Sequence, residues 1–252
     1  MDHKKRIKCR SIFISDTHFG LAESQVELLH DFLKTYDSEY LYLVGDIIDF
    51  WKLSNGGKWE QKHNNIVRKI LSMAKHKTKV IYVPGNHDEV VRQYVGSDFG
   101  NIQIKKHDIH TCADGKKYYV MHGDEVDLVV GKMRFLAVLG SEAYDLSITL
   151  SHWLNKLRGT FGLPYWSLSS YLKRHVKEAV NYIGNFEESV SKIAKENKVD
   201  GVICGHIHNP IIIKQKDIMY VNCGDWVESC TAVIENLDGS LELVDWSRKL
   251  TK

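Results

Sequence analysis

The chain has 252 residues, of which 43% are hydrophobic and 26% charged, and its formal net charge is +2. These values fit a globular protein whose size suits a single domain carrying an insertion. The small net charge gives no reason to expect nucleic acid as a partner, and no uninterrupted apolar run is long enough to span a bilayer.

The N-terminal segment and the cysteines both favour the cytoplasm. Residues 1–8 are charged and contain no apolar stretch of the signal-peptide type. The five cysteines are an odd number without the spacing of a disulfide framework, so we expect reduced thiols.

The first third of the chain alternates two kinds of pattern. Short apolar runs predict buried strands at residues 11–15, 40–44 and 80–83. Apolar residues at helical spacing predict helices between these runs, at residues 26–36 and 66–73. This order is typical of a parallel sheet covered by helices, so the predicted fold class is α/β.

From residue 104 onward the pattern changes. Apolar runs on either side of Asp114-Gly115 predict a hairpin. Four later runs predict further, largely antiparallel strands at residues 211–213, 219–221, 231–234 and 241–244. Between the two groups, residues 125–198 form a helical stretch, which we interpret as a cap inserted into one domain spanning residues 1–252.

Five polar clusters interrupt the apolar runs at predicted strand ends. They are Asp16-Thr17-His18, Gly45-Asp46-Ile47-Ile48-Asp49, Gly85-Asn86-His87-Asp88, His122-Gly123-Asp124 and Gly205-His206-Ile207-His208. In open α/β sheets, functional groups lie just beyond the carboxyl ends of the strands. We therefore expect these clusters to meet in space.

The clusters offer oxygen and imidazole ligands. Asp16 and His18 are two residues apart in an extended segment, so both can bind one ion, and the carboxylate of Asp46 can bridge two ions. The remaining candidates are an amide and three imidazoles: Asn86, His122, His206 and His208. Such mixed sets suit manganese, iron, zinc or magnesium. Two ions about 3.5–4 Å apart would lower the pKa of a shared water and clamp the oxygens of an in-line displacement.

Alone, an Asp-x-His cluster is more often a turn with a surface histidine, and a Gly-Asn-His-Asp cluster a tight turn, than a metal site. Five clusters in order at strand ends favour a two-metal hydrolytic centre.

The ordered set D-x-H, G-D-x-x-D, G-N-H-D, H and G-H-x-H resembles the calcineurin-like metallophosphoesterase superfamily over residues 16–208. The resemblance implies a four-layer αββα sandwich with two metal ions between its sheets. It implies that the first metal is bound by Asp16, His18, Asp46 and His208, and the second by Asp46, Asn86, His122 and His206. Asp46 would bridge them, and a metal-bridging hydroxide would be the nucleophile.

The same resemblance suggests roles for neighbouring residues. His87 matches the position that contacts the substrate phosphate and can protonate the leaving oxygen. We expect Asp88 to orient His87, and Asp49 to lie beside the ligands without being one.

Within the superfamily, motif order, size and cap position look most like the UDP-2,3-diacylglucosamine hydrolase family. Its members use manganese to split UDP-2,3-diacylglucosamine into UMP and 2,3-diacylglucosamine 1-phosphate in lipid A assembly. That family typically has arginine at the position of His87, which suggests a sister group. The resemblance implies a phosphorylated, nucleotide-linked lipid substrate and a cytoplasmic enzyme in peripheral contact with the inner membrane.

The predicted cap combines apolar residues with basic ones, so it can receive an acyl chain on one face and phosphates on the other. We expect Arg158 and Lys173 to contact substrate together with Asn86 and His87. Alternatively, the apolar residues of the cap only pack it onto the sheet. Two other functions also fit the motifs: a phosphomonoesterase or protein-phosphatase-like hydrolase, and a metal-bearing scaffold without turnover.

Overall fold

The computed structural model describes residues 6–126, 184 and 186–247. The chain divides into two compact units, one formed by residues 1–125 and 190–252 and the other by residues 126–189. The predicted cap at residues 125–198, with Arg158 and Lys173, lies for the most part outside the described residues and stays a prediction. The following description concerns the first unit.

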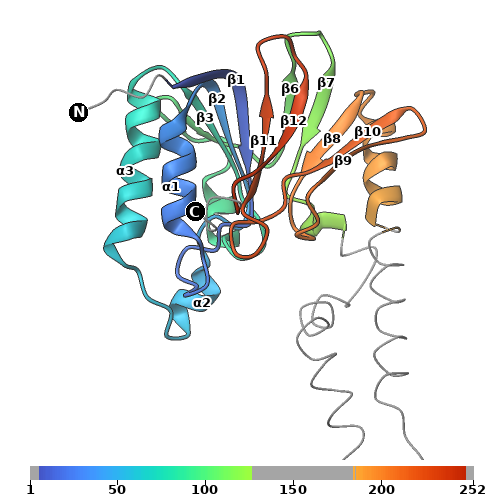
Figure 1. Ribbon diagram of the computed structural model, residues 1–252. Helices are drawn as coiled ribbons and strands as arrows, with labels where there is room; N and C mark the ends of the chain where they lie inside the picture. The colour runs from blue at the N-terminus through green and yellow to red at the C-terminus, as the bar shows by residue number, and fades with distance from the viewer. Residues whose placement is uncertain (1–5, 127–183, 185, 248–252) are drawn as a thin grey trace, which may run out of the picture. The chain divides into compact units, whose positions relative to one another are not determined.

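Two sheets form the centre of this unit (Figure 1). The larger has the strand order β12-β11-β1-β2-β3-β5-β4. Its strands are β1 (Ile7–Ile14), β2 (Tyr36–Val44), β3 (Lys79–Val83), β4 (Asp98–Phe99), β5 (Ile102–Ile104), β11 (Thr231–Glu235) and β12 (Leu241–Asp245). Strands β1, β2, β3 and β5 are parallel to their neighbours in this group, whereas β11, β12 and β4 pair antiparallel.

The smaller sheet has the order β6-β7-β8-β10-β9. Its strands are β6 (Asp108–Thr111), β7 (Lys117–Val120), β8 (Gly201–Cys204), β9 (Ile211–Gln215) and β10 (Ile218–Asn222). Strands β6 and β7 form the predicted hairpin, and β9 and β10 form a second one. Parallel pairing of β8 with both β7 and β10 joins the two hairpins.

Helices cover the outer faces of both sheets. Helices α1 (Val26–Thr35) and α3 (Gln61–Lys75) lie on the larger sheet, and residues 190–196 form a helical segment beside the smaller one (Figure 1). Two short elements, α2 (Phe50–Ser54) and the 3-10 helix η1 (Glu89–Tyr94), follow β2 and β3. The order helix, sheet, sheet, helix confirms the predicted αββα sandwich.

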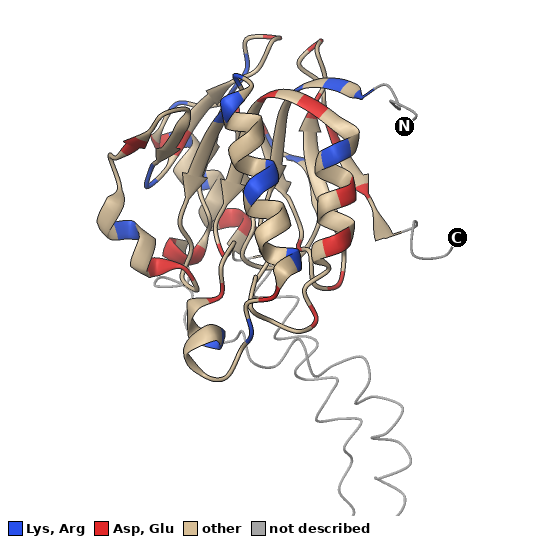
Figure 2. Cartoon of the chain, turned by 90° about the vertical axis from the view of Figure 1, so that its left-hand side faces the viewer, with Lys and Arg blue, Asp and Glu red and all other residues tan. Residues whose placement is uncertain are grey.

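Helix α3 begins a full turn before its predicted start. Glu60 and His63 form a capping box, in which the backbone N–H of Glu60 donates to His63 Nδ1 at 2.8 Å. The first turn is polar and therefore carries no apolar periodicity, although the cap satisfies its free N–H groups. Helix α1 carries charged residues of both signs, whereas those of α3 are all basic (Figure 2).

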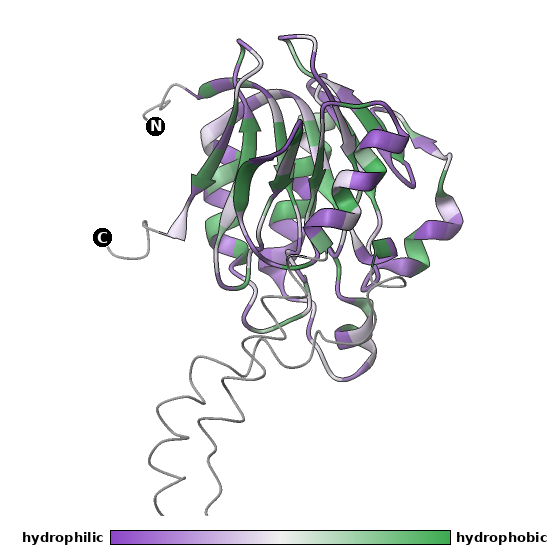
Figure 3. Ribbon diagram, turned by 90° about the vertical axis from the view of Figure 1, so that its right-hand side faces the viewer, coloured by the Kyte–Doolittle hydropathy of each residue, from purple (hydrophilic) through white to green (hydrophobic). Residues whose placement is uncertain are grey.

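The apolar core has two parts, one on each face of the larger sheet. Ile12 and Ile14 of β1 pack with Leu29 of α1, whereas Phe13, between them, packs with Val120 and Val221 of the smaller sheet. A strand buried on both faces needs apolar residues at successive positions. This explains the continuous apolar run of β1, and the same pattern is visible in the other central strands (Figure 3).

A polar network also lies between the sheets. Glu235 of β11 is fully buried and accepts hydrogen bonds from Arg10 Nη1 at 2.8 Å and from Ser11 Oγ at 2.5 Å. Its Oε2 lies 2.7 Å from His110 Nε2. Burial raises the pKa of Glu235, but the hydrogen bonds from His110 and Ser11 outweigh burial and lower it to about 2. The carboxylate thus links β1, β6 and β11.

Within residues 6–126 and 186–247, no helix has the length and apolar content needed to cross a membrane.

Candidate metal centre

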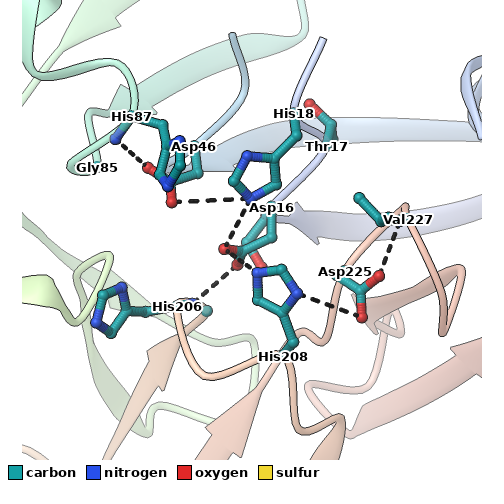
Figure 4. Close-up of polar contacts among 12 residues, drawn as sticks. Asp16, Thr17, His18, Asp46, Gly85, His87, His206, His208, Asp225 and Val227 are labelled. Atoms are coloured by element: carbon teal, nitrogen blue, oxygen red, sulfur yellow. Dashed lines mark hydrogen bonds and ion pairs between the residues drawn. The ribbon is translucent and has the colours of Figure 1, made fainter. Parts of the chain in front are cut away.

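Six of the seven predicted ligands form two groups at one end of the sandwich. The ligand atoms of Asp16, His18 and His208 lie within 4.8 Å of one another, and so do those of Asp46, His122 and His206. The first group comes from the segments after β1 and β8, and the second from those after β2, β7 and β8. The strand ends predicted to meet therefore do so (Figure 4).

Asp46 lies between the two groups. Its Oδ2 is 3.3 Å from His122 Nε2 and 3.9 Å from His18 Nε2, so one oxygen faces an imidazole of each group. Within the first group, Asp16 Oδ1 is 3.0 Å from His208 Nε2. This placement is what a bridging carboxylate requires.

Asn86, the seventh predicted ligand, lies in the turn after β3. The next residue, His87, donates its backbone N–H to Asp46 Oδ1 at 2.7 Å. The turn is thus tied to the bridging carboxylate. A metal-binding role for Asn86 stays a prediction.

The backbone at the site is strained. Asp16, His18, Asp46, His206 and His208 all have positive φ angles, between 46° and 71°. Residues other than glycine rarely adopt this left-handed region, and each costs about 1–3 kcal/mol. Such strain persists only where surrounding structure enforces it, and it gathers at functional sites.

Two imidazoles are held in one orientation. His122 Nδ1 lies 3.0 Å from the carbonyl oxygen of Val44, and His18 Nδ1 lies 3.0 Å from Asp49 Oδ2. A carbonyl or carboxylate can only accept, so each Nδ1 carries a proton, and in the neutral ring each Nε2 presents its lone pair to the centre.

The inward nitrogens fit a cation. The Nε2 atoms of His18, His122 and His208 are buried and have no hydrogen-bond partner. Each lies 3.0–3.9 Å from a buried carboxylate of Asp16 or Asp46. Buried nitrogen lone pairs without donors, beside carboxylates, are satisfied when a divalent cation lies between them. The residues present therefore fit two such ions, one per group.

The pKa values indicate the same electrostatics. Burial lowers the pKa of His122, but the charge of Asp46 and a hydrogen bond with it raise that pKa to about 10. Burial likewise lowers the pKa of His18, whereas Asp16 and Asp49 raise it to about 9. For Asp46, burial raises the pKa, and His122 brings it below its usual range. The carboxylates thus attract a positive charge to this point.

Metal binding is expected to depend on pH. Without a cation, the rings of His18 and His122 carry a second proton at pH 7, on Nε2, since their pKa values are about 9 and 10. A metal ion displaces these protons, so affinity should rise with pH, by roughly tenfold per pH unit for each proton released. Manganese titration by calorimetry at pH 6.5, 7.5 and 8.5, in buffers of different ionisation enthalpy, measures both effects. Equal manganese affinities at the three pH values, with no proton release, would contradict protonated His18 and His122 in the metal-free site.

His87 lies at the edge of the centre, with its side chain 21% exposed. Its Nδ1 is 3.0 Å from Asp49 Oδ2, the oxygen that also contacts His18. The ring of Trp51 lies against it, with 4.4 Å between ring centroids. Burial raises the pKa of Asp49, but His18 and His87 bring it below its usual range. Asp49 is therefore an anion that lies beside both imidazoles.

Asp88 does not orient His87, contrary to the sequence prediction. Its Oδ2 accepts from the backbone N–H of Ile47 at 2.8 Å and from Tyr82 Oη at 2.5 Å, and its Oδ1 accepts from Gly85 N–H. Asp88 is fully buried and ties the loop after β2 to the loop after β3. Its side chain satisfies backbone donors, and the carboxylate beside His87 is Asp49.

The sequence profile of calcineurin-like phosphoesterases matches residues 9–210, well over half of the chain. The chain belongs to the calcineurin-like phosphoesterase family. It is accordingly a metal-dependent phosphoester hydrolase, and the family predicted from the motifs is confirmed.

Curated relatives of this phosphoesterase share one name. The UDP-2,3-diacylglucosamine hydrolase of Blochmanniella floridana is 23% identical over 212 residues, which cover 80% of this chain and 81% of the relative. The enzyme of the same name from Histophilus somni (strain 129Pt) is 29% identical, covering 91% of this chain and 97% of its own. A solved archaeal phosphodiesterase aligns over 93% of this chain and 98% of its own, at 13% identity and a TM-score of 0.45.

The motifs of this phosphoesterase did not reveal every residue at the site. Trp51 was not identified from the sequence, and its 48% exposure beside His87 is known only from the structure. The role of Asp49 beside His87 depends on a contact that spans 38 positions of sequence, and no local pattern indicates it.

Proposed function

We propose that this phosphoesterase hydrolyses the diphosphate bond of UDP-2,3-diacylglucosamine, giving UMP and 2,3-diacylglucosamine 1-phosphate. Two carboxylate–imidazole groups lie side by side, and Asp46 Oδ2 faces an imidazole of each. This arrangement supports a two-metal hydrolytic reaction. The names of the curated relatives support the substrate. Such a substrate would bring the enzyme to the cytoplasmic face of the inner membrane.

The metal assignments are part of this proposal. Asp16, His18, Asp46 and His208 would hold one ion, and Asp46, Asn86, His122 and His206 the other. Two divalent cations, which we propose to be manganese, would supply a water of lowered pKa and positive charge for the phosphoryl oxygens.

His87 and Asp49 would handle the leaving group. As a water oxygen bonds to phosphorus, the bond from phosphorus to the bridging oxygen breaks, and that oxygen gains negative charge. His87 can hydrogen-bond it or give it a proton, while Asp49 Oδ2 lies 3.0 Å from Nδ1 on the same ring. Whether UMP or the sugar phosphate departs, it leaves as a stable anion, so its departure needs little proton transfer.

His87→Ala is therefore expected to slow substrates unequally. Alkyl phosphodiesters, whose leaving groups need a proton, should lose roughly 10²–10⁴-fold in kcat, and p-nitrophenyl esters much less. Parallel assays of the two ester classes measure the difference, with His107→Ala, at a ring stacked on Tyr119 of β7, as control. Equal losses on both classes would remove the acid role and leave only phosphate binding.

One observation favours a second function. The pairing of His87 with Asp49 is most useful when the leaving group is a poor one, as in a phosphodiester or phosphomonoester of an alcohol. A phosphatase-like hydrolase acting on such esters is thus the alternative.

A substrate panel assayed with manganese tests these proposals. It contains UDP-2,3-diacylglucosamine, UDP-sugars, cyclic nucleotides and a phosphopeptide. Turnover that requires the acyl chains supports the lipid substrate, and preferred cleavage of cyclic nucleotides or the phosphopeptide supports the alternative. A protein that binds metal but turns over none of them would be a scaffold.

A further inference from the structure

A short turn after β10 contacts the first metal-binding group. The backbone N–H of Trp226 donates to the carbonyl oxygen of Asp16 at 3.0 Å. In the same turn, Asp225 Oδ2 lies 4.0 Å from His208 Nδ1 (Figure 4). The turn thus reaches both Asp16 and His208 without offering a ligand of its own.

The carboxylate of Asp225 is held firmly. The residue is 1% exposed, and its Oδ1 accepts from the backbone N–H groups of Val227 at 2.8 Å and Glu228 at 2.6 Å. Its own backbone N–H donates to Ser229 Oγ at 3.0 Å. Oδ2 accepts a longer hydrogen bond from the backbone N–H of Ser229, at 3.4 Å, and lies toward His208.

The imidazoles of His18 and His122 show how an acceptor beside Nδ1 orients a ring. His18 and His122 each have Nδ1 3.0 Å from an acceptor, and each turns Nε2 toward the centre. His208 has the same polarity, with Nε2 3.0 Å from Asp16 Oδ1 and Nδ1 toward Asp225. Its side chain is 33% exposed, compared with 7% for His18 and 1% for His122, so fewer contacts restrain it.

We propose that Asp225 is a positioning residue for His208. Its negative charge favours the tautomer with the proton on Nδ1, which keeps the lone pair of Nε2 toward the first metal ion. The inference rests on the proposed function, because it assumes that His208 binds metal. It goes beyond that function because it gives Asp225, a residue outside the family motifs, an influence on metal affinity through His208.

Asp225→Asn tests the role, because the substitution separates the two tasks of the side chain. The amide oxygen can still accept from Val227 and Glu228, whereas the amide NH₂ cannot accept from His208. We expect manganese affinity at the first group to fall about 10–100-fold, the usual effect of losing such a partner. Manganese stoichiometry by mass spectrometry at limiting metal should fall from two ions toward one, and the electron paramagnetic resonance spectrum should change from a coupled pair to a single ion.

A matched control and a double-mutant cycle distinguish positioning from a structural role. Asp238→Asn changes another turn aspartate, whose Oδ1 accepts from Ser240 N–H far along the β11–β12 hairpin. It should leave affinity unchanged, and both variants should unfold at similar temperatures. In a His208→Ala background, Asp225→Asn should change affinity less than twofold, because the ring on which it acts is absent.

Either of two results would overturn the inference. The first is a manganese affinity of Asp225→Asn equal to that of Asp238→Asn. The second is that Asp225→Asn lowers manganese affinity as much in the His208→Ala background as in the wild type. In both cases the wild-type protein still reports on the proposed function. If the wild type binds no second manganese and hydrolyses no phosphoester, the proposed function fails, and this inference fails with it.

Discussion

Asp46→Asn is expected to lower kcat/KM by roughly 10²–10⁴-fold and to reduce metal binding in both groups. Asp46 Oδ2 is the oxygen that faces both His18 and His122, and Oδ1 holds the turn of His87. A 10²–10⁴-fold loss corresponds to about 3–5 kcal/mol of transition-state stabilisation, which the charge shared by the two groups would supply. Asparagine keeps the shape and one acceptor, so the effect isolates the charge.

Hydrolysis of bis(p-nitrophenyl) phosphate and metal analysis of the purified variant measure the two effects together. Asp37→Asn is the matched control, since Asp37 lies on the same strand, β2, but is exposed at its other end. The control should bind two ions and keep full activity. An Asp46→Asn protein that still binds two ions and works within tenfold of the wild type would show that Asp46 does not bridge.

Gly45→Ala is expected to destabilise the fold and displace His122. Gly45 has a φ of +74°, and a Cβ there would lie 2.2 Å from His122 Nδ1. The left-handed backbone costs alanine about 1–2 kcal/mol, and the overlap costs about 1–3 kcal/mol more. Because the ring must move, the bond from Nδ1 to the carbonyl of Val44 breaks, and the second group should lose metal.

Gly100→Ala separates the two costs. Gly100 has a similar φ of +65°, but a Cβ there would meet nothing within 4 Å. It should therefore show only the backbone cost, seen as a small fall in melting temperature, with full activity and two bound ions. Equal melting temperatures for the two variants, with metal retained by Gly45→Ala, would mean that His122 has room to adjust.

The hydrophobic pattern predicts the sandwich because it depends on local geometry. The run of β1 is apolar at successive positions because β1 is buried on both faces, and α1 shows the helical spacing of a helix covering one face. The start of α3 is missed for the opposite reason, since its capping box consists of polar residues.

The clusters also predict where the site lies. Consecutive parallel strands must place their carboxyl ends together, so Asp16 and Asp46 meet whatever the details of packing. The orientation of each side chain does not follow from this rule. Asp88 is next to His87 in the chain, yet its carboxylate faces the backbone of Ile47 and Gly85, because three donors converge there.

By itself, then, the sequence determined the αββα fold, the family, the hydrolytic chemistry and the edge at which six predicted ligands gather. Only the tertiary structure decided which neighbours act on them: Asp49 on His18 and His87, Val44 on His122, and Asp225 near His208. It also decided the link of Glu235 to His110, across 125 positions. The physical reason is that secondary structure and strand order depend on local periodicity, whereas side-chain contacts depend on which distant loops the folded core brings together.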